Sequence, residues 1–479
     1  MAPHLHFSSL VLGYLLASAS ANPVPEAEPD PNPQISLPPL IPSVPGFADP
    51  LSSLTPPLPV LQVPTPPKDS PPFVGSNIKP KKIAFYWVGA GDNDHADFLA
   101  TYSLDDDTFG TLIWLTDVPT SGNSPHHLGS SLDGKTLVGG GLLSLLKTQD
   151  TAYYFDVSNP YRPKFKKSNR ALTAAITDEI RAKPDGGFLI TYMGSAGGTS
   201  PGRLVETDSN FDIIAQHPQD IAGNANVLKD LFNPHGLSID FEKNIILTSD
   251  FIVPLSILKP SLGKISDNTL RLWNLASRTI ISTITIPNGG GIQDVKFIPG
   301  NKESAALATA VHLGQIWIIY PFRTDVNGQQ GVAELFYDLG PKARDQVAIY
   351  TDFTQDGKFY YATITTANHI AALDISDLNN PKRLDNPDDN QPTIGPHYIK
   401  VTPNQKNIVV TDYFVQTGSI GLINTPADYK ALYIDINPDG SLHFNRSIDF
   451  TTPYTNRGGG RPHSSVVFDL TDPNHPYYY

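Results

Sequence analysis

The stretch TQDGKFYYATI, residues 354–364, joins a polar turn to a run of strand-forming residues. Asp356 and Gly357 suit a tight turn, because a short polar side chain and a glycine tolerate the backbone angles that turns require. The aromatic and β-branched residues that follow favour an extended strand. The stretch therefore predicts a turn between two β-strands.

This pattern of turn and strand recurs along the chain. Its other copies are SLDGKTLVGG (131–140), KPDGGFLITYMG (183–194), DFEKNIILTSD (240–250), IPGNKESAALATA (298–310) and TPNQKNIVVTD (402–412). Successive turns lie about 50 to 60 residues apart, the length of one four-stranded propeller blade. The turn residues are Asp133, Asp185, Glu242, Asn301, Asp356 and Asn404. Six internal blades are predicted.

A seventh blade is predicted from the two ends of the repeat region. KIAFYWVG (82–89), DFLATYSL (97–104) and TLIWLTDV (111–118) supply three strands, and RPHSSVVFDL (461–470) supplies one inner strand. Joining them closes a ring and removes the open sheet edges. The sequence thus predicts an all-β, seven-bladed β-propeller over residues 81–479. A large β-sandwich or two smaller β domains are the alternatives that the periodicity leaves open.

Composition limits the classes of partner. The formal net charge is −13 and no long basic run occurs, whereas binding to nucleic acid needs clustered Lys and Arg. The chain has no cysteine, so disulfides and thiolate chemistry are excluded. We therefore expect a small-molecule substrate and no nucleic-acid partner.

The N-terminal region predicts export. Residues 1–21 combine an apolar run with a small-residue site, Ala19-Ser20-Ala21, as in a cleaved secretory signal peptide. In residues 22–80 roughly every third residue is proline, which predicts a disordered, extended linker or propeptide that could contact a cell wall or surface. No later segment is apolar enough to span a bilayer. The sequon at Asn445 fits a secreted glycoprotein.

Four histidines occupy equivalent places in this repeat. His126, His235 and His397 each lie seven residues before a turn residue, and His463 begins the closing strand. Each follows a proline. Because the inner strands of a propeller line its central channel, these side chains are expected around one mouth. His127 is a weaker candidate, because strand alternation would point it away from His126.

Loops joining the second and third strands of a blade reach the same mouth. They are expected to carry His95, His369 and Asp250. Converging imidazoles without thiolates suit copper, iron or zinc, with carboxylates orienting the rings. The sequence therefore predicts a metal site, although acid–base use of the histidines and structural hydrogen bonding are alternatives.

Several segments, taken in order, resemble the selenium-binding protein and methanethiol oxidase family. These are DFLATYSLDDD, SPHHLGSS, DNTLRLWNLASRTIISTI, NHIAALDISDLNNPKRL and GPHYIKVTPNQKNIVVT. The resemblance runs from about Lys82 to the C-terminus. It implies a propeller fold and copper-dependent oxidation of a thiol to an aldehyde, hydrogen peroxide and hydrogen sulfide.

Carried over by position, the resemblance implies roles for particular residues. His126 and His127 match the family's paired histidines, His369 matches its loop histidine, and His463 matches its C-terminal histidine. Asp250 stands where the family tends to have Glu. Family members carry cysteines and this chain has none, so selenium binding through a thiol is excluded.

The leading hypothesis is a secreted oxidoreductase in which copper, or alternatively iron, is bound by His126, His235, His397 and His463. His369, His95 and Asp250 would orient substrate or transfer protons. A second hypothesis is a lactonase-like or cyclase-like propeller in which a histidine acts as a base without redox chemistry. The third is a non-catalytic extracellular binding propeller.

Overall fold

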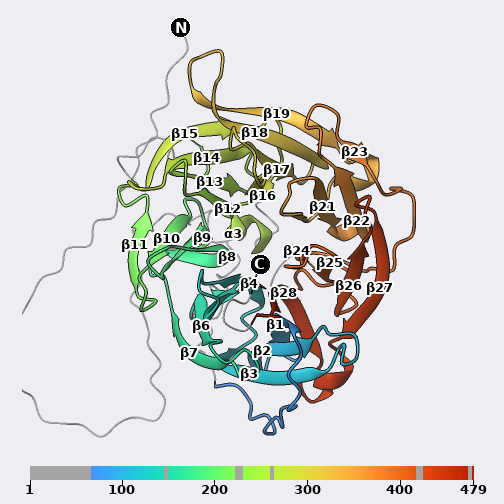
Figure 1. Ribbon diagram of the computed structural model, residues 1–479. Coiled ribbons are helices and arrows are strands. Elements are labelled where there is room, and N and C mark those ends of the chain that lie inside the picture. Colours follow the sequence, from blue (N-terminus) through green and yellow to red (C-terminus); the bar gives the residue numbers. More distant parts are fainter. Residues whose placement is uncertain are drawn as a thin grey trace, which may run out of the picture. The chain divides into compact units, whose positions relative to one another are not determined.

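The computed structural model describes residues 66–144, 149–221, 230–258, 264–416, 424–472 and 477–478. The expected signal peptide, residues 1–21, and residues 22–65 of the proline-rich segment lie outside this part. In the described part the chain forms seven antiparallel sheets, which Figure 1 shows around a common centre. The prediction of a seven-bladed β-propeller is confirmed.

Blade 1 is built from both ends of the chain. Its strands are β28 (Gly460–Asp469), β1 (Lys82–Ala90), β2 (Ala96–Ser103) and β3 (Leu112–Ser121), and β29 (Tyr477–Tyr478) pairs with β28. β1 and β28 run antiparallel, with Ile83 opposite Phe468. The predicted closure of the ring by a C-terminal strand is therefore confirmed.

Blades 2 to 7 follow in chain order, and in each the first strand lies nearest the centre (Figure 1). Blade 2 contains β4 (Pro125–Ser130), β5 (Thr136–Gly141), β6 (Ala152–Asp156) and β7 (Lys164–Asn169). Blade 3 contains β8 (Ala174–Ala182), β9 (Phe188–Ser195), β10 (Arg203–Thr207) and β11 (Ile213–His217). Blade 4 contains β12 (Pro234–Asp240), β13 (Ile245–Asp250), β14 (Thr269–Asn274) and β15 (Thr279–Thr285). Blade 5 contains β16 (Ile292–Phe297), β17 (Ala306–Ala310), β18 (Gln315–Thr324) and β19 (Gln330–Asp338). Blade 6 contains β20 (Ile349–Phe353), β21 (Phe359–Ile364), β22 (His369–Asp374) and β23 (Lys382–Arg383). Blade 7 contains β24 (Ile399–Val401), β25 (Asn407–Thr411), β26 (Lys430–Ile436) and β27 (Leu442–Asp449). All six predicted turns join the first and second strands of a blade.

The core lies between neighbouring blades. Strands near the centre are covered on both faces, so β1 is buried along nearly its whole length, whereas the outer strand β27 alternates between partly buried and exposed positions. Between blades 1 and 2, the ring of Trp87 packs against Tyr153 and Phe155, with ring centroids 5.6 and 5.5 Å away. This sheet-on-sheet packing fixes the blades around the channel.

The end of the proline-rich segment lies against blade 1. Ser76 donates its backbone N–H to Ile113 O over 3.0 Å, and the guanidinium of Arg162 lies 4.6 Å from the ring centre of Trp114 while bonding Ser76 O. Residues 66–80, expected to be part of a disordered arm, therefore include a segment that hydrogen-bonds to the propeller.

Helices in the described ranges are short: α3 (Pro254–Leu258) and the 3₁₀ turns η2 (Pro341–Ala343), η3 (Thr365–Ala367) and η4 (Thr452–Arg457). None of these described helices has the length and apolar character needed to cross a bilayer.

Candidate metal centre

Four histidines converge at the start of the inner strands. The ring nitrogens of His126, His127, His397 and His463 include one set that lies within 4.8 Å of one another. The four side chains, which we term the histidine cluster, are each no more than 1% exposed. The structure thus brings together four of the five candidate ligands, including the weaker candidate His127, and leaves His235 outside this group.

A β-bulge explains why both members of the histidine pair face the channel. Pro125 pairs with Gly141 and Leu128 with Gly139, so β4 advances three residues while β5 advances two. The extra residue breaks the strict alternation of side chains. The rings of His126 and His127 therefore stack, with centroids 4.4 Å apart. The expectation that His127 points away was wrong, because it assumed an unbroken strand.

The backbone that carries the histidines is held by hydroxyl groups of neighbouring strands. His126 O accepts a hydrogen bond from Ser464 over 2.5 Å. The carbonyls of His397 and His463 accept bonds of 2.6 Å from Thr363 and Thr411. These buried carbonyls are thereby satisfied, and each imidazole starts from a fixed backbone position.

Hydrogen bonds also fix which ring nitrogen carries the proton. Nδ1 of His126 lies 3.0 Å from Thr177 O, and Nδ1 of His463 lies 2.8 Å from Phe414 O. A carbonyl only accepts, so both Nδ1 atoms must donate, and the Nε2 atoms keep a free lone pair. Nδ1 of His127 lies 3.0 Å from the Glu179 carboxylate. Such partners orient metal-binding imidazoles in proteins.

The electrostatics keep His127, His397 and His463 neutral. Burial, followed by the neighbouring histidines, lowers the pKa of His397 and of His463 well below its usual value, and burial likewise lowers the pKa of His127. Among the described residues, Nε2 of His126, His127 and His463 and both ring nitrogens of His397 have no hydrogen-bond partner. Buried polar atoms without partners are costly, and a bound metal ion would satisfy them.

His235 lies beside the cluster with an unpredicted carboxylate. Oδ1 of Asp178 is 3.2 Å from Nδ1 of His126 and 3.6 Å from Nε2 of His235, and the three residues form a second group with metal-ligand spacing. Neither oxygen of Asp178 has a hydrogen-bond partner among the described residues. Burial lowers the pKa of His235. His235 therefore belongs to the site through Asp178.

Asp178 and Glu179 were missed by the sequence reasoning, although a signal for them exists. Asp178 lies seven residues before the turn residue Asp185, the same register as His126, His235 and His397. The sequence prediction used this register for histidines alone. Acidic residues at the same register include Asp178.

The carboxylate of Glu179, beside His127, allows a test of the metal site. Burial alone would raise the pKa of Glu179, but Arg181 and His127 hold it well below its usual range, so the group is a carboxylate. We expect Glu179→Gln to weaken metal affinity about 10- to 100-fold, because a neutral amide replaces the carboxylate that lies beside Nδ1 of His127 and orients its ring. Competition titration with a chromogenic chelator measures this. Glu206→Gln, which removes a carboxylate paired with Lys183 and Arg278, should leave the affinity unchanged.

The three residues predicted to be catalytic are bonded elsewhere. Nδ1 of His95 lies 2.6 Å from Asp92 in the β1–β2 loop, and Nε2 of His369 lies 2.7 Å from Asp385. Asp250 accepts from the Asn233 backbone and Thr269 at the end of β13. All three lie on the predicted face of the propeller, but none belongs to either group of candidate ligands.

Asp250 instead forms part of a buried acidic pair. Burial raises the pKa of Asp250 to about 6, and burial together with Asp250 raises the pKa of Asp267 to about 8. Between about pH 4 and pH 8, the Asp267 carboxyl group is therefore protonated in the folded protein and ionised in the unfolded chain. Over this range, each unit of rising pH lowers the free energy of unfolding by as much as ~1.4 kcal/mol through this group.

Asp267→Asn removes this contribution. We expect the stability of the variant relative to the wild type to rise steadily from pH 4 to pH 8, measured by urea denaturation at each pH. A difference that is constant over this range would show that Asp267 is ionised in the folded protein. Asp439→Asn, at an exposed turn, serves as the control.

Apolar side chains cover the histidines. The ring of Phe414 lies 4.1 Å from His397, and that of Phe251 lies 5.4 Å from His235. Both phenylalanines follow the second strand of a blade and are at most 5% exposed. The covering excludes water from the polar cluster, which strengthens its electrostatic interactions.

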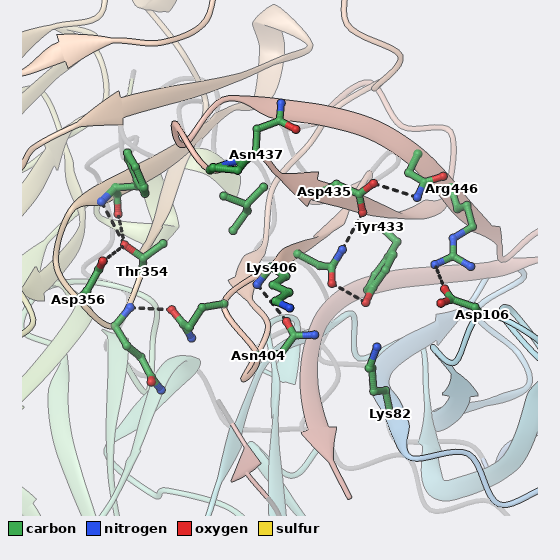
Figure 2. Close-up of a pocket in the computed structure, with 17 residues that line it drawn as sticks. Lys82, Asp106, Thr354, Asp356, Asn404, Lys406, Tyr433, Asp435, Asn437 and Arg446 are labelled. Atoms are coloured by element: carbon green, nitrogen blue, oxygen red, sulfur yellow. Dashed lines mark hydrogen bonds and ion pairs between the residues drawn. The ribbon is translucent and has the colours of Figure 1, made fainter. Parts of the chain in front are cut away.

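A separate cleft lies on the opposite face. Figure 2 shows this cavity of about 1020 Å³, which the turns of blades 6 and 7 and strands β26 and β27 line. Its polar groups bond to one another: Arg446 to Asp106 over 2.8 Å, and Asn445 to Asp435 over 3.0 Å. No member of the histidine cluster lines it.

Comparisons with known proteins place the chain among propellers. No family model and no curated protein sequence matches it. A hypothetical selenium-binding protein from Sulfolobus tokodaii is similar in structure, with a TM-score of 0.63 and 16% identity over 81% of this chain and 94% of that one. The periplasmic gluconolactonase of Pseudomonas aeruginosa gives a TM-score of 0.55 and 11% identity over 80% and 98%. At these identities the likeness shows a shared propeller fold.

Proposed function

We propose that the protein is a secreted, metal-dependent oxidoreductase that acts on a small organic substrate, with copper, or alternatively iron, bound by His126, His127, His397 and His463. The supporting observation is the convergence of four buried imidazoles whose unprotonated nitrogens have no partner among the described residues. Four nitrogen ligands without a thiolate suit these metals. Secretion rests on the apolar N-terminal run and its small-residue site.

Bound copper would supply electron transfer from an organic thiol to dioxygen, which with water gives an aldehyde, hydrogen sulfide and hydrogen peroxide. The chain's own residues would prepare the site for this chemistry. Thr177 O and Phe414 O hold protons on Nδ1 of His126 and of His463, and the Glu179 carboxylate lies 3.0 Å from Nδ1 of His127. The Asp178 carboxylate, 3.6 Å from His235, could hold or accept a proton beside the ligands.

A lactonase is the second candidate function, and Asp178 is the observation that favours it. A buried carboxylate next to two imidazoles can act as a general base toward water without any redox step. The likeness to a gluconolactonase propeller fits this alternative. In that case His235 and Asp178 would be needed for activity, and oxygen would not be consumed.

Metal analysis tests the proposal. Protein purified without chelators should contain about one copper or iron ion per chain, and the double variant His126→Ala, His397→Ala should contain none. His369→Ala is the matched control, because His369 is buried but bonds Asp385 outside the cluster. A folded wild type that neither contains nor takes up these metals contradicts the proposal. Oxygen uptake with methanethiol, compared with hydrolysis of gluconolactone, separates the two activities.

A further inference from the structure

The central channel has a second mouth, at the opposite end from the histidine cluster. A cavity of about 260 Å³ lies where the inner strands reach their turns. Its lining comes from the inner strands of five blades and the residues that follow them, β4, β8, β12, β24 and β28. No member of the cluster lines it, so it is a distinct site on the channel axis.

The charged residues that line this cavity are cationic. They are Arg181, from β8, and Lys400, from β24; the cavity's described lining contains no acidic residue. Lys400 is 7% exposed, and burial lowers its pKa. Two cations from blades far apart in the sequence thus face one small space, an arrangement that attracts an anion.

Arg181 presents the geometry that a carboxylate requires. Its two hydrogen bonds recorded within the described residues, to Glu179 and to Ile180 O, are both donated by Nη1. Nε and Nη2 therefore form a fork directed away from these partners, and such a fork pairs with both oxygens of a carboxylate. The Arg181 side chain is 28% exposed, so a solute reaches it without unfolding the strand.

The remaining walls are largely apolar. Leu128, Ile180, Ile239, Phe241 and Val466 line the cavity, and the residues with hydroxyl groups in the lining are Ser130, Ser238 and Tyr398. A cationic head site with apolar walls of this size fits a short organic acid better than an inorganic ion, which would leave the apolar walls without a partner.

The cavity is connected to the cluster by a chain of contacts. Arg181 bonds Oε1 of Glu179, and Oε2 of Glu179 lies 3.0 Å from Nδ1 of His127 and accepts a 2.6 Å bond from Tyr350. An anion on Arg181 would compete with Glu179 for its positive charge. The carboxylate would then interact more strongly with the His127 imidazole.

We propose that this second mouth is a binding site for a small organic carboxylate, held by the Arg181 fork and Lys400, and that its occupancy is transmitted through Glu179 to His127. The proposal does not depend on the metal or on the redox chemistry proposed above. It assigns an anionic ligand to the channel end opposite the histidines.

Calorimetric titration with propionate, and with propionamide as the neutral isostere, tests the site. Propionate is expected to bind at least about tenfold more tightly, because only the anion forms charge-assisted bonds. Arg181→Gln should remove this preference, and Arg181→Lys, which keeps the charge beside Glu179 but loses the fork, should weaken propionate binding by about tenfold. Lys243→Gln, at an exposed turn on the same face, should change nothing. Near-ultraviolet circular dichroism establishes that each variant is folded.

Two further readouts separate this proposal from the metal proposal. Propionate should shift the imidazole NMR signals of His127, and its affinity should be the same before and after chelation. Binding that is lost on chelation would place the carboxylate on the metal and overturn the assignment. Equal affinity for propionate and propionamide, or wild-type affinity in folded Arg181→Lys, would also overturn it.

Discussion

Replacing His397 by leucine is expected to leave the metal-free protein at least as stable as the wild type while abolishing its stabilisation by metal. His397 is fully buried, and neither ring nitrogen has a partner among the described residues. An unsatisfied buried polar group costs about 1–3 kcal/mol, and leucine fills most of the same space. Metal at 100 times its dissociation constant stabilises a folded protein by about 2.7 kcal/mol, which the variant should lose.

Thermal and urea unfolding with chelator and with added copper measure both effects. His369→Leu provides the contrast, because it breaks a 2.7 Å pair with Asp385. That variant should be destabilised in chelator and should keep the stabilisation by metal. If His397→Leu were clearly less stable than the wild type in chelator, the ring would have a structural partner and would not be held ready for a metal.

Trp87→Ala should lower the free energy of unfolding by about 3–5 kcal/mol. The Trp87 side chain is 1% exposed, donates Nε1–H to Gly140 O over 2.8 Å, and fills the space between blades 1 and 2. Blade 1 contains the junction of the two chain ends, so weakening its packing also weakens the closure of the ring. Urea denaturation gives the value from the midpoint and slope.

Trp317→Ala is the comparison variant for this effect. Trp317 lies in the third strand of blade 5, is only partly buried, and donates Nε1–H to the side chain of Gln315. Its loss should cost clearly less than the loss of Trp87. Equal costs would mean that the interface at the ring junction is no more important for stability than the outer strands.

The sequence predicts the fold well because a propeller is a repeat. Each turn residue, such as Asp133 or Asp356, recurs at blade spacing, and the order of strands follows from the spacing alone. The first blade has only three strands near the N-terminal end of the repeat region, so residues 461–470 are predicted to supply the fourth strand and close the ring. The same register located His126, His397 and His463, because equivalent positions on inner strands must meet at the axis.

Other parts of the site depend on geometry that periodicity does not contain. The bulge in β4 reverses the expected direction of His127, and nothing in PHHLGS distinguishes it from a regular strand. His95 and His369 lie on the expected face, but sequence does not give their distance from the axis. Export, glycosylation, the choice of metal and the redox activity stay predictions.

The closing strand also has a consequence for the order of assembly. His463 lies on β28, the last long strand of the chain, and it is held by Thr411 of blade 7 and by pairing of β28 with β1. The fourth imidazole therefore reaches the site only when β28 has paired with β1 and the ring has closed. The metal proposed above would therefore find its complete ligand set only in the closed propeller, and a chain truncated before His463 would lack it.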